Sequence, residues 1–211
     1  SEIKRLASGW KIDPSFSPDG KWIAFAGSQG IERVSVDGGD PQLVTEAVED
    51  PGGTHWGKDG YIYFIPDYGM GVSRIRPEAG EVEVLFEPDY SLGERGFICV
   101  TLHPDEKSVI AGRYGENGLE IVVVEIESGK RTVLAKGMCP AVTDDGRLYF
   151  AQGPKLMSAQ LMGSNSVSNL TEITARMYTD NGTLSSQHAV SDRGDLIFIE
   201  GRSEWGRKLE I

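Results

Sequence analysis

The sequence predicts an all-β protein, a five-bladed β-propeller built from four-stranded antiparallel blades. Three observations predict it: a polar turn recurs five times, short apolar segments surround each turn, and no ten-residue stretch has a helical period. A length of 211 residues suits one propeller, so we expect residues 1–211 to form a single domain. The 27 glycines and 10 prolines supply the tight turns that such a fold needs.

The recurring unit is a short strand, a polar turn and a second strand. It reads SFSPDGKWIAF at 15–25, HWGKDGYIYF at 55–64, LHPDEKSVIAG at 102–112, VTDDGRLYF at 142–150 and VSDRGDLIFIEG at 190–201. The equivalent turn residues, 40, 46, 40 and 48 positions apart, are Asp19, Asp59, Asp105, Asp145 and Arg193. This spacing is the length of one four-stranded blade.

Each copy divides into four strands, which we name a to d from the axis outwards. In the first copy we expect strands over 13–17, 21–27, 31–36 and 41–46. Later copies repeat strands c and d as GVSRIR and VEVLFE, LEIVVVEI and RTVLAK, and KLMSAQLM and VSNLTE. Because Asp side chains commonly bond to the backbone two residues on, we expect the four turn aspartates to stabilise their turns rather than bind metal.

The two ends of the chain predict how the ring closes. The fifth copy stops at RKLEI, residues 207–211, which corresponds to its strand c, whereas residues 2–8 look like a strand d without a blade. Pairing these segments would complete the fifth blade and remove free sheet edges. The alternative is a fragment of a larger ring. Because the chain opens inside a repeat, we expect a domain of a longer protein, and its compartment stays open.

The net charge of −11 argues against nucleic acid and anionic lipid surfaces as partners. No apolar run approaches the roughly 18 residues that span a bilayer, and SEIKRLASGW lacks the layout of a signal peptide, so no membrane insertion by this segment is expected. If the chain belongs to a membrane-spanning sensor, this region would be extracytoplasmic.

The cysteines and histidines lack the spacing of a metal site, so no metal and no cofactor is expected. Cys99 and Cys139 are predicted to be buried free thiols, with one disulfide as the alternative. His55 and His188 lie in or beside predicted inner strands and are assigned to the central channel. They would line a water-filled channel or bond to a backbone carbonyl; the alternative is that they hold a small anion or a metal ion.

Partner binding is predicted on the side of the ring that carries the irregular loops. Strand order places the b–c loops and the links between blades on that side, and binding on a rigid scaffold usually lies in such loops. Tyr, Trp and Arg are enriched at interface hot spots. The candidate residues are Tyr68, Arg95, Arg113, Tyr114 and Trp205. The alternative is that these aromatic side chains only pack against neighbouring loops.

The segments SFSPDGKWIAF and VSVDGGDPQLV resemble the TolB-type, WD-like propeller repeat. THWGKDGYIYF, GVSRI, QHAVSDRGDLIFIEG and the terminal RKLEI are similar to the propeller region of some bacterial serine/threonine protein kinases. The resemblance covers nearly the whole chain and implies a scaffold for protein contact or ligand sensing without a catalytic motif. The third copy departs from it with HPDEK, and the fifth with SDRGD.

Two functions remain open on these grounds. The first is a non-catalytic propeller that binds a protein or small ligand, as the sensor region of a larger signalling protein. The second is a glycan-binding or glycoside-hydrolysing propeller, which needs carboxylates converging at the channel mouth. Asp13, Asp67, Glu116 and Glu204 are available, but their local sequence does not distinguish them from solvated loop charges. No kinase, G-x-S-x-G, H-E-x-x-H or P-loop signature occurs.

Overall fold

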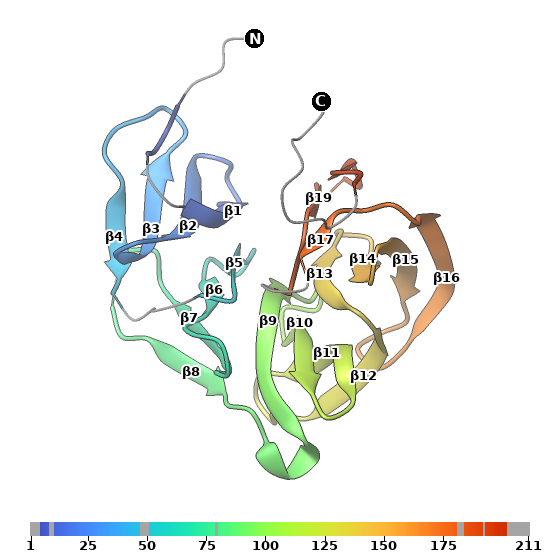
Figure 1. The fold of residues 1–211 in the computed structure, drawn as a ribbon. Helices are drawn as coiled ribbons and strands as arrows, with labels where there is room; N and C mark the ends of the chain where they lie inside the picture. Colours follow the sequence, from blue (N-terminus) through green and yellow to red (C-terminus); the bar gives the residue numbers. More distant parts are fainter. Residues whose placement is uncertain are drawn as a thin grey trace.

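A computed structural model describes residues 5–8, 11–46, 51–78, 80–180, 184–191 and 193–201. Each of the first four sequence copies folds into one four-stranded antiparallel sheet whose strands follow chain order (Figure 1). The first sheet contains β1 (Lys11–Phe16), β2 (Trp22–Gly27), β3 (Gly30–Ser35) and β4 (Gln42–Thr45). The second contains β5 (Gly53–Trp56), β6 (Ile62–Ile65), β7 (Val72–Ile75) and β8 (Glu83–Phe86).

The third and fourth sheets are longer versions of the same unit. The third contains β9 (Glu94–Leu102), β10 (Ser108–Gly115), β11 (Gly118–Glu125) and β12 (Arg131–Lys136). The fourth contains β13 (Met138–Val142), β14 (Arg147–Gln152), β15 (Lys155–Leu161) and β16 (Val167–Thr174). The predicted strands agree with these bounds to within about two residues, the usual uncertainty of an element's end.

The turns between the first and second strands form as predicted. Asp19 Oδ1 accepts a 3.1 Å hydrogen bond from the Lys21 backbone N–H, and Asp105 Oδ1 accepts one of 2.8 Å from the Lys107 N–H. Asp59 and Asp145 accept equivalent bonds from the backbone two residues on. The four aspartates therefore stabilise their own turns, which confirms that part of the prediction.

The first strand of each sheet lies nearest a common centre, as Figure 1 shows. Around that centre β1 contacts β5, β5 contacts β9, and β9 contacts β13. The apolar core lies between consecutive sheets, because both faces of the middle strands are covered. Trp56, for example, packs with Ile62 and Phe64 of its own sheet against Ala24 and Ile31 of the first sheet.

In each four-stranded sheet, the turns between consecutive strands lie alternately at two opposite ends of the ring. The a–b turns meet at one end, where Lys58 of the second sheet forms an ion pair with Asp144 of the fourth sheet. The c–d turns lie at the same end as the a–b turns. His103 Nε2, on the a–b turn of the third sheet, lies 3.3 Å from the carbonyl oxygen of Gly163, on the c–d turn of the fourth sheet. The b–c loops and the links between sheets therefore lie at the other end.

The fifth copy is smaller in the part of the chain that the structure describes. Two short hairpins follow the fourth sheet, β17 (Thr179–Asp180) with β18 (Ser185–Ser186) and β19 (His188–Val190) with β20 (Leu196–Phe198). β13 contacts β18 and β19, so the order around the centre continues. The first of these hairpins occupies the long link over 173–187, where no strand was predicted.

The predicted closing strands are described only in part. The expected strand over 207–211 lies outside the described residues. Residues 5–8, the described part of its expected partner at 2–8, form no strand. In the residues that the structure describes, four four-stranded sheets are therefore followed by two two-stranded hairpins. In the residues that it describes, no helix has the length and apolar character needed to cross a membrane.

Candidate functional site

Three loops from two neighbouring sheets meet at the end of the ring that carries the irregular loops. They are the β6–β7 loop, the link from β8 to β9, and the β10–β11 loop. The Phe97 backbone N–H donates a 3.2 Å hydrogen bond to the Met70 carbonyl, and the Glu116 N–H donates one of 3.0 Å to the Gly93 carbonyl. These bonds join the loops into one surface.

This surface carries several large apolar or aromatic side chains, and we call it the tyrosine face. Its members are Tyr68, Met70, Tyr90, Leu92, Arg95 and Tyr114. Tyr90 is 73% exposed and Leu92 54%, while Met70 is 45% and Tyr68 36% exposed. Arg95 is exposed, and Tyr114 is half-buried. Four exposed large side chains on one loop cluster are more than the scattered single residues of an ordinary surface.

The link that presents Tyr90 and Leu92 is held in a defined shape. Residues Tyr90–Leu92 form a 3₁₀ turn, η1, and the Asp89 carboxylate accepts hydrogen bonds from the Ser91 N–H (2.9 Å) and Oγ (2.6 Å). Gly93 ends the turn at φ 74°, a left-handed conformation that glycine adopts without strain. The two apolar side chains therefore project from a capped turn rather than from an unstructured loop.

Tyr114 supports the face from below. A Cβ on Gly96 would lie 2.7 Å from both Gly69 Cα and the Tyr114 hydroxyl oxygen, so only glycine allows the loops to approach this closely. Burial raises the pKa of Tyr114; a hydrogen bond with the Gly69 backbone opposes this, and Asp67 and Tyr90 add to it. Tyr114 therefore remains a neutral phenol at pH 7, fixed between the two loops.

Arg113 occupies a different environment from the one expected. It is buried, and its guanidinium donates to the Glu94 carboxylate at 3.0 Å and forms a second ion pair with Glu120. Arg131 Nε lies 3.0 Å from Glu94, and Lys136 Nζ lies 2.7 Å from Glu120. The expectation that Arg113 lies on the surface and contacts a partner is therefore corrected. Its side chain lies within the third sheet and supports the tyrosine face from there.

The remaining residue predicted for this face is Trp205, which lies outside the described residues. The structure thus brings Tyr68, Arg95 and Tyr114 to one end of the ring and buries Arg113 beneath them. Sequence reasoning did not single out Met70, Tyr90 or Leu92. The signal for the last two was the sequence DYSLG, in which Asp89, Ser91 and Gly93 are the residues of a capped turn.

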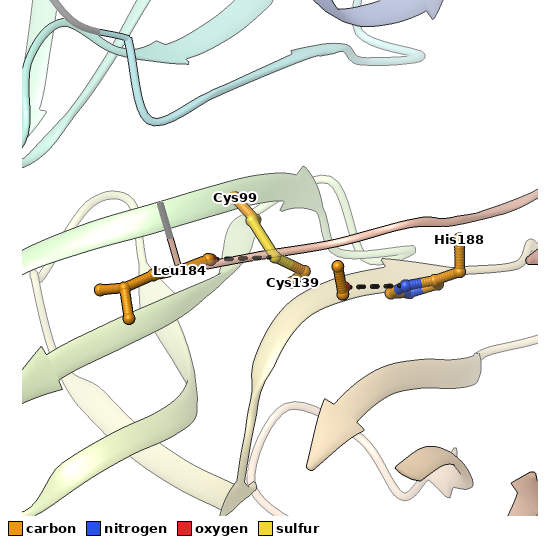
Figure 2. Close-up of a disulfide and its surroundings, with 5 residues drawn as sticks. Cys99, Cys139, Leu184 and His188 are labelled. Atoms are coloured by element: carbon orange, nitrogen blue, oxygen red, sulfur yellow. Dashed lines mark hydrogen bonds between the residues drawn. A yellow bond between two sulfur atoms is a disulfide. The ribbon is translucent and has the colours of Figure 1, made fainter. Parts of the chain in front are cut away.

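The two histidines predicted for the channel lie on separate inner strands, β5 and β19. Burial lowers the pKa of His55 to about 4, opposed by the nearby charge of Asp59. Burial also lowers the pKa of His188 to about 4, opposed by a hydrogen bond with the Cys139 backbone. His188 Nδ1 lies 3.0 Å from Ser186 Oγ (Figure 2). Both imidazoles are therefore neutral at pH 7.

The carboxylates considered for glycoside hydrolysis are spread over several elements. Asp13 lies on β1 and is exposed, whereas Asp67 and Glu116 lie in loops of the tyrosine face. Glu204 lies outside the described residues. Within the described residues no three His, Cys, Asp or Glu side chains are grouped so that they could hold a metal ion.

The cysteines form a disulfide, Cys99 with Cys139, which corrects the expectation of free thiols (Figure 2). The Cα atoms are 4.9 Å apart, within the range that a disulfide spans. The bond joins β9 to β13, the inner strands of the third and fourth sheets. A pair 40 residues apart at equivalent positions of successive repeats was the signal in the sequence.

Comparison with known proteins found similarity in the fold but not in the sequence. No family model matches the chain, and no curated protein sequence matches it. A putative TolB from Agrobacterium tumefaciens is similar in structure, with a TM-score of 0.67, 19% identity, and coverage of 94% of this chain and 72% of that one. A TolB from Acinetobacter baumannii has a TM-score of 0.56 and 18% identity, covering 75% and 45%.

Propellers of other kinds are similar as well. A gluconolactonase from Xanthomonas campestris has a TM-score of 0.60 and 14% identity, covering 90% of this chain and 69% of that one. A chain of a nidogen/laminin complex has a TM-score of 0.60 and 13% identity, covering 83% and 78%. At such identities the likeness shows the fold alone. The four-stranded sheets, their order around a common centre and these similarities together establish that the chain is a β-propeller.

Proposed function

We propose that this chain is a non-catalytic propeller scaffold that binds a protein partner through the tyrosine face. The observation that carries the proposal is the group of exposed large side chains, Tyr68, Met70, Tyr90 and Leu92, on loops held by backbone hydrogen bonds. Tyrosine and methionine are enriched at protein interfaces, where they contribute large contact areas. Loops already fixed in shape lose little conformational entropy on binding.

The ring that presents this face is proposed to have five blades. In the described sheets, the residue before each a–b turn packs against the preceding sheet: Trp56, Leu102 and Val142 contact apolar clusters. The equivalent residue of the first sheet, Phe16, is 63% exposed. We expect the last sheet to pack against Phe16, because that sheet precedes the first one in a closed ring. Closure by residues 2–8 and 207–211 remains part of this proposal.

The resemblance to the propeller region of bacterial serine/threonine kinases supports a further part of the proposal. The chain would be the sensor region of a larger signalling protein, and partner binding at the tyrosine face would be the sensed event. The coding sequence on either side of this segment tests this context. A neighbouring kinase domain supports it, and a neighbouring domain without a signalling role contradicts it.

The binding experiment uses variants at the two ends of the ring. A partner captured by the wild-type chain is identified, and its dissociation constant is measured with Tyr68→Ala, Arg95→Ala and Lys107→Ala. We expect at least tenfold weaker binding for the first two and no change for Lys107→Ala, whose exposed side chain lies on an a–b turn at the opposite end. Unchanged binding by both face variants, with an unchanged thermal transition, contradicts the proposal.

The second candidate function is action on, or binding of, a carbohydrate. It is favoured by the structural similarity to a protein named a gluconolactonase and by the half-buried, neutral imidazoles of His55 and His188 on inner strands. A panel of chromogenic glycosides and sugar lactones, together with a glycan array, separates the candidates. Turnover that disappears in Asp13→Asn or His55→Gln would establish the second function and overturn the first.

A further inference from the structure

The inner strands share a backbone distortion at one level of the ring. Six residues before each turn aspartate, the residues Asp13, Gly53, Cys99 and Cys139 have φ values of 49°, 151°, 47° and 51°. Neighbouring strands approach closely here, because a Cβ on Gly53 would lie 2.8 Å from the Cα of Cys99. Two successive positions of this level carry the cysteines, and their Cα atoms are 4.9 Å apart.

We propose that Cys99 and Cys139 form a reversible thiol–disulfide exchange site for small thiols and dithiols, which attack at Cys99. The two sulfur-bearing residues differ in access. Cys99 is partly exposed, whereas Cys139 is 7% exposed and its sulfur contacts the carbonyl oxygen of Leu184 (Figure 2). Exchange requires the attacking thiolate to reach a sulfur in line with the disulfide bond, so the accessible sulfur is the point of entry.

The exchange consumes one dithiol for each disulfide. The reductant's thiolate attacks Cys99 Sγ and forms a mixed disulfide, the bond between the cysteines breaks, and the electron pair leaves on the Cys139 sulfur, which takes a proton from water. The second thiol of the reductant then attacks its own sulfur in the mixed disulfide and releases Cys99 as a thiol. The dithiol supplies two electrons and two protons and ends as a disulfide.

The surroundings accommodate the reduced pair. Cys139 Sγ lies 3.6 Å from the Leu184 carbonyl oxygen, a distance at which a thiol S–H donates a hydrogen bond and a disulfide sulfur cannot. The strands that carry the cysteines are also held by their own sheets, β9 by β10 and β13 by β14. Reduction therefore replaces the covalent link with a hydrogen bond without requiring either strand to leave its sheet.

The position of the pair gives its redox state a structural consequence. Cys139 belongs to the apolar cluster of Met138, Tyr149 and Met177. The side chains after β17 that pack on this cluster are Leu184, Val190, Leu196 and Phe198. Thiol exchange at Cys99 therefore takes place next to the apolar contact between the fourth sheet and residues 184–198.

The first test uses the wild-type chain under native conditions. The oxidised protein is incubated with dithiothreitol, quenched with acid, unfolded and alkylated, so that the mass counts the thiols formed, while circular dichroism follows the fold. We expect two new thiols with an unchanged spectrum. Reduction that occurs only when urea unfolds the chain, or a chain isolated under oxidising conditions that contains no disulfide, overturns the proposal.

The second test locates the point of attack with a matched pair of variants. Cys139→Ser and Cys99→Ser each leave one thiol, and each is treated with oxidised glutathione, which transfers one glutathione to a thiolate and releases the other as a thiol. We expect the mixed disulfide to form at least tenfold faster at Cys99 than at Cys139. Equal rates, or faster modification of Cys139, contradict the assignment. If either variant fails to fold, the wild-type measurement still decides whether the disulfide is exchanged in the folded chain.

Discussion

The guanidinium of Arg113 lies 3.0 Å from the carboxylate of Glu94 inside the third sheet, where the Glu94 side chain has no exposed surface. This pair lies directly beneath the tyrosine face, since Arg131 connects the same carboxylate to the Glu87 carbonyl in the link from β8 to β9 (2.6 Å). The Asp89 N–H donates to Glu94 as well, at 2.8 Å. One buried carboxylate thus joins β9, β10, β12 and the loop that presents Tyr90.

Removing the arginine from this network is expected to destabilise the fold. Arg113→Ala leaves Glu94 and Glu120 with one fewer cation each, and breaking a buried ion pair costs about 3–5 kcal/mol. Lys136 and Arg131 remain nearby, so we expect the lower part of that range. Urea unfolding measures the loss. Arg95→Ala, at the exposed arginine next to Glu94 on β9, is the control and should change stability by less than about 0.5 kcal/mol.

Arg113 also shows where sequence reasoning reaches its limit. Both Arg95 and Arg113 stand near loops that the repeat places on one face, and composition alone could not separate them. Their difference arises from the alternation of side chains along β9 and β10: Arg113 points toward Glu94 and Glu120, whereas Arg95 points to solvent. The partners of Arg113, Glu94 and Glu120, stand 19 and 7 positions away in the chain.

The histidines on the inner strands predict a loss of stability in mild acid. His55 and His188 have pKa values of about 4 in the folded chain, below the ordinary value of 6.5. The unfolded chain therefore binds more protons between these values, so stability is fully present above pH 6.5 and is lost as the pH falls toward 4. We expect a loss of about 1–3 kcal/mol for each histidine, measured by urea unfolding at pH 7, 5.5 and 4.5.

A variant separates the histidines from the carboxylates in this measurement. His55→Gln removes one titrating group, so the unfolding free energy should depend less steeply on pH between 6.5 and 4.5. Carboxyl groups such as Glu120, where hydrogen bonds from Lys136 and Arg113 lower the pKa against the effect of burial, lose their contribution only below about pH 4.5. A His55→Gln profile parallel to that of the wild type would contradict the buried, neutral state of this imidazole.

The close approach of the inner strands predicts a large difference between two glycines. Gly53 and Gly80 have similar φ values, 151° and 143°. An alanine Cβ at Gly53 would lie 2.8 Å from the Cys99 Cα, while none of the surrounding atoms lies within 4 Å of one at Gly80. Gly53→Ala should therefore cost about 1–3 kcal/mol more than Gly80→Ala in urea unfolding. Equal effects would show that the strands are not in contact at this level.

Closure of the ring predicts that Phe16 is covered. If the last sheet packs against it, Phe16→Ser should lower the free energy of unfolding by about 2–4 kcal/mol. Val84→Ser is the control, because Val84 is 56% exposed on the outer strand β8 and should change stability by less than about 0.5 kcal/mol. Equal, small effects of both substitutions would contradict the five-bladed ring.

The local parts of the fold could be predicted because they depend on local chemistry. The Asp-Gly turns and the apolar segments beside them specify hairpins, and the bounds of β1 to β4 follow from them. The ion pairs of Glu94 could not be predicted, since they join residues 19 and 37 positions apart on different strands of the third sheet. The sequence left the disulfide open as an alternative, because its formation depends on how the third and fourth sheets pack. The blade count depends on segments at both chain ends that the described residues do not include.

Met70 and Met162 provide the most direct test of the proposed function, because both are exposed methionines and they lie at opposite ends of the ring. A photo-reactive amino acid is placed at Met70 in one chain and at Met162 in another, and each is irradiated with the captured partner. We expect a cross-link to the partner from position 70 and none from position 162. A cross-link from position 162 alone, or equal cross-linking from both positions, would contradict it.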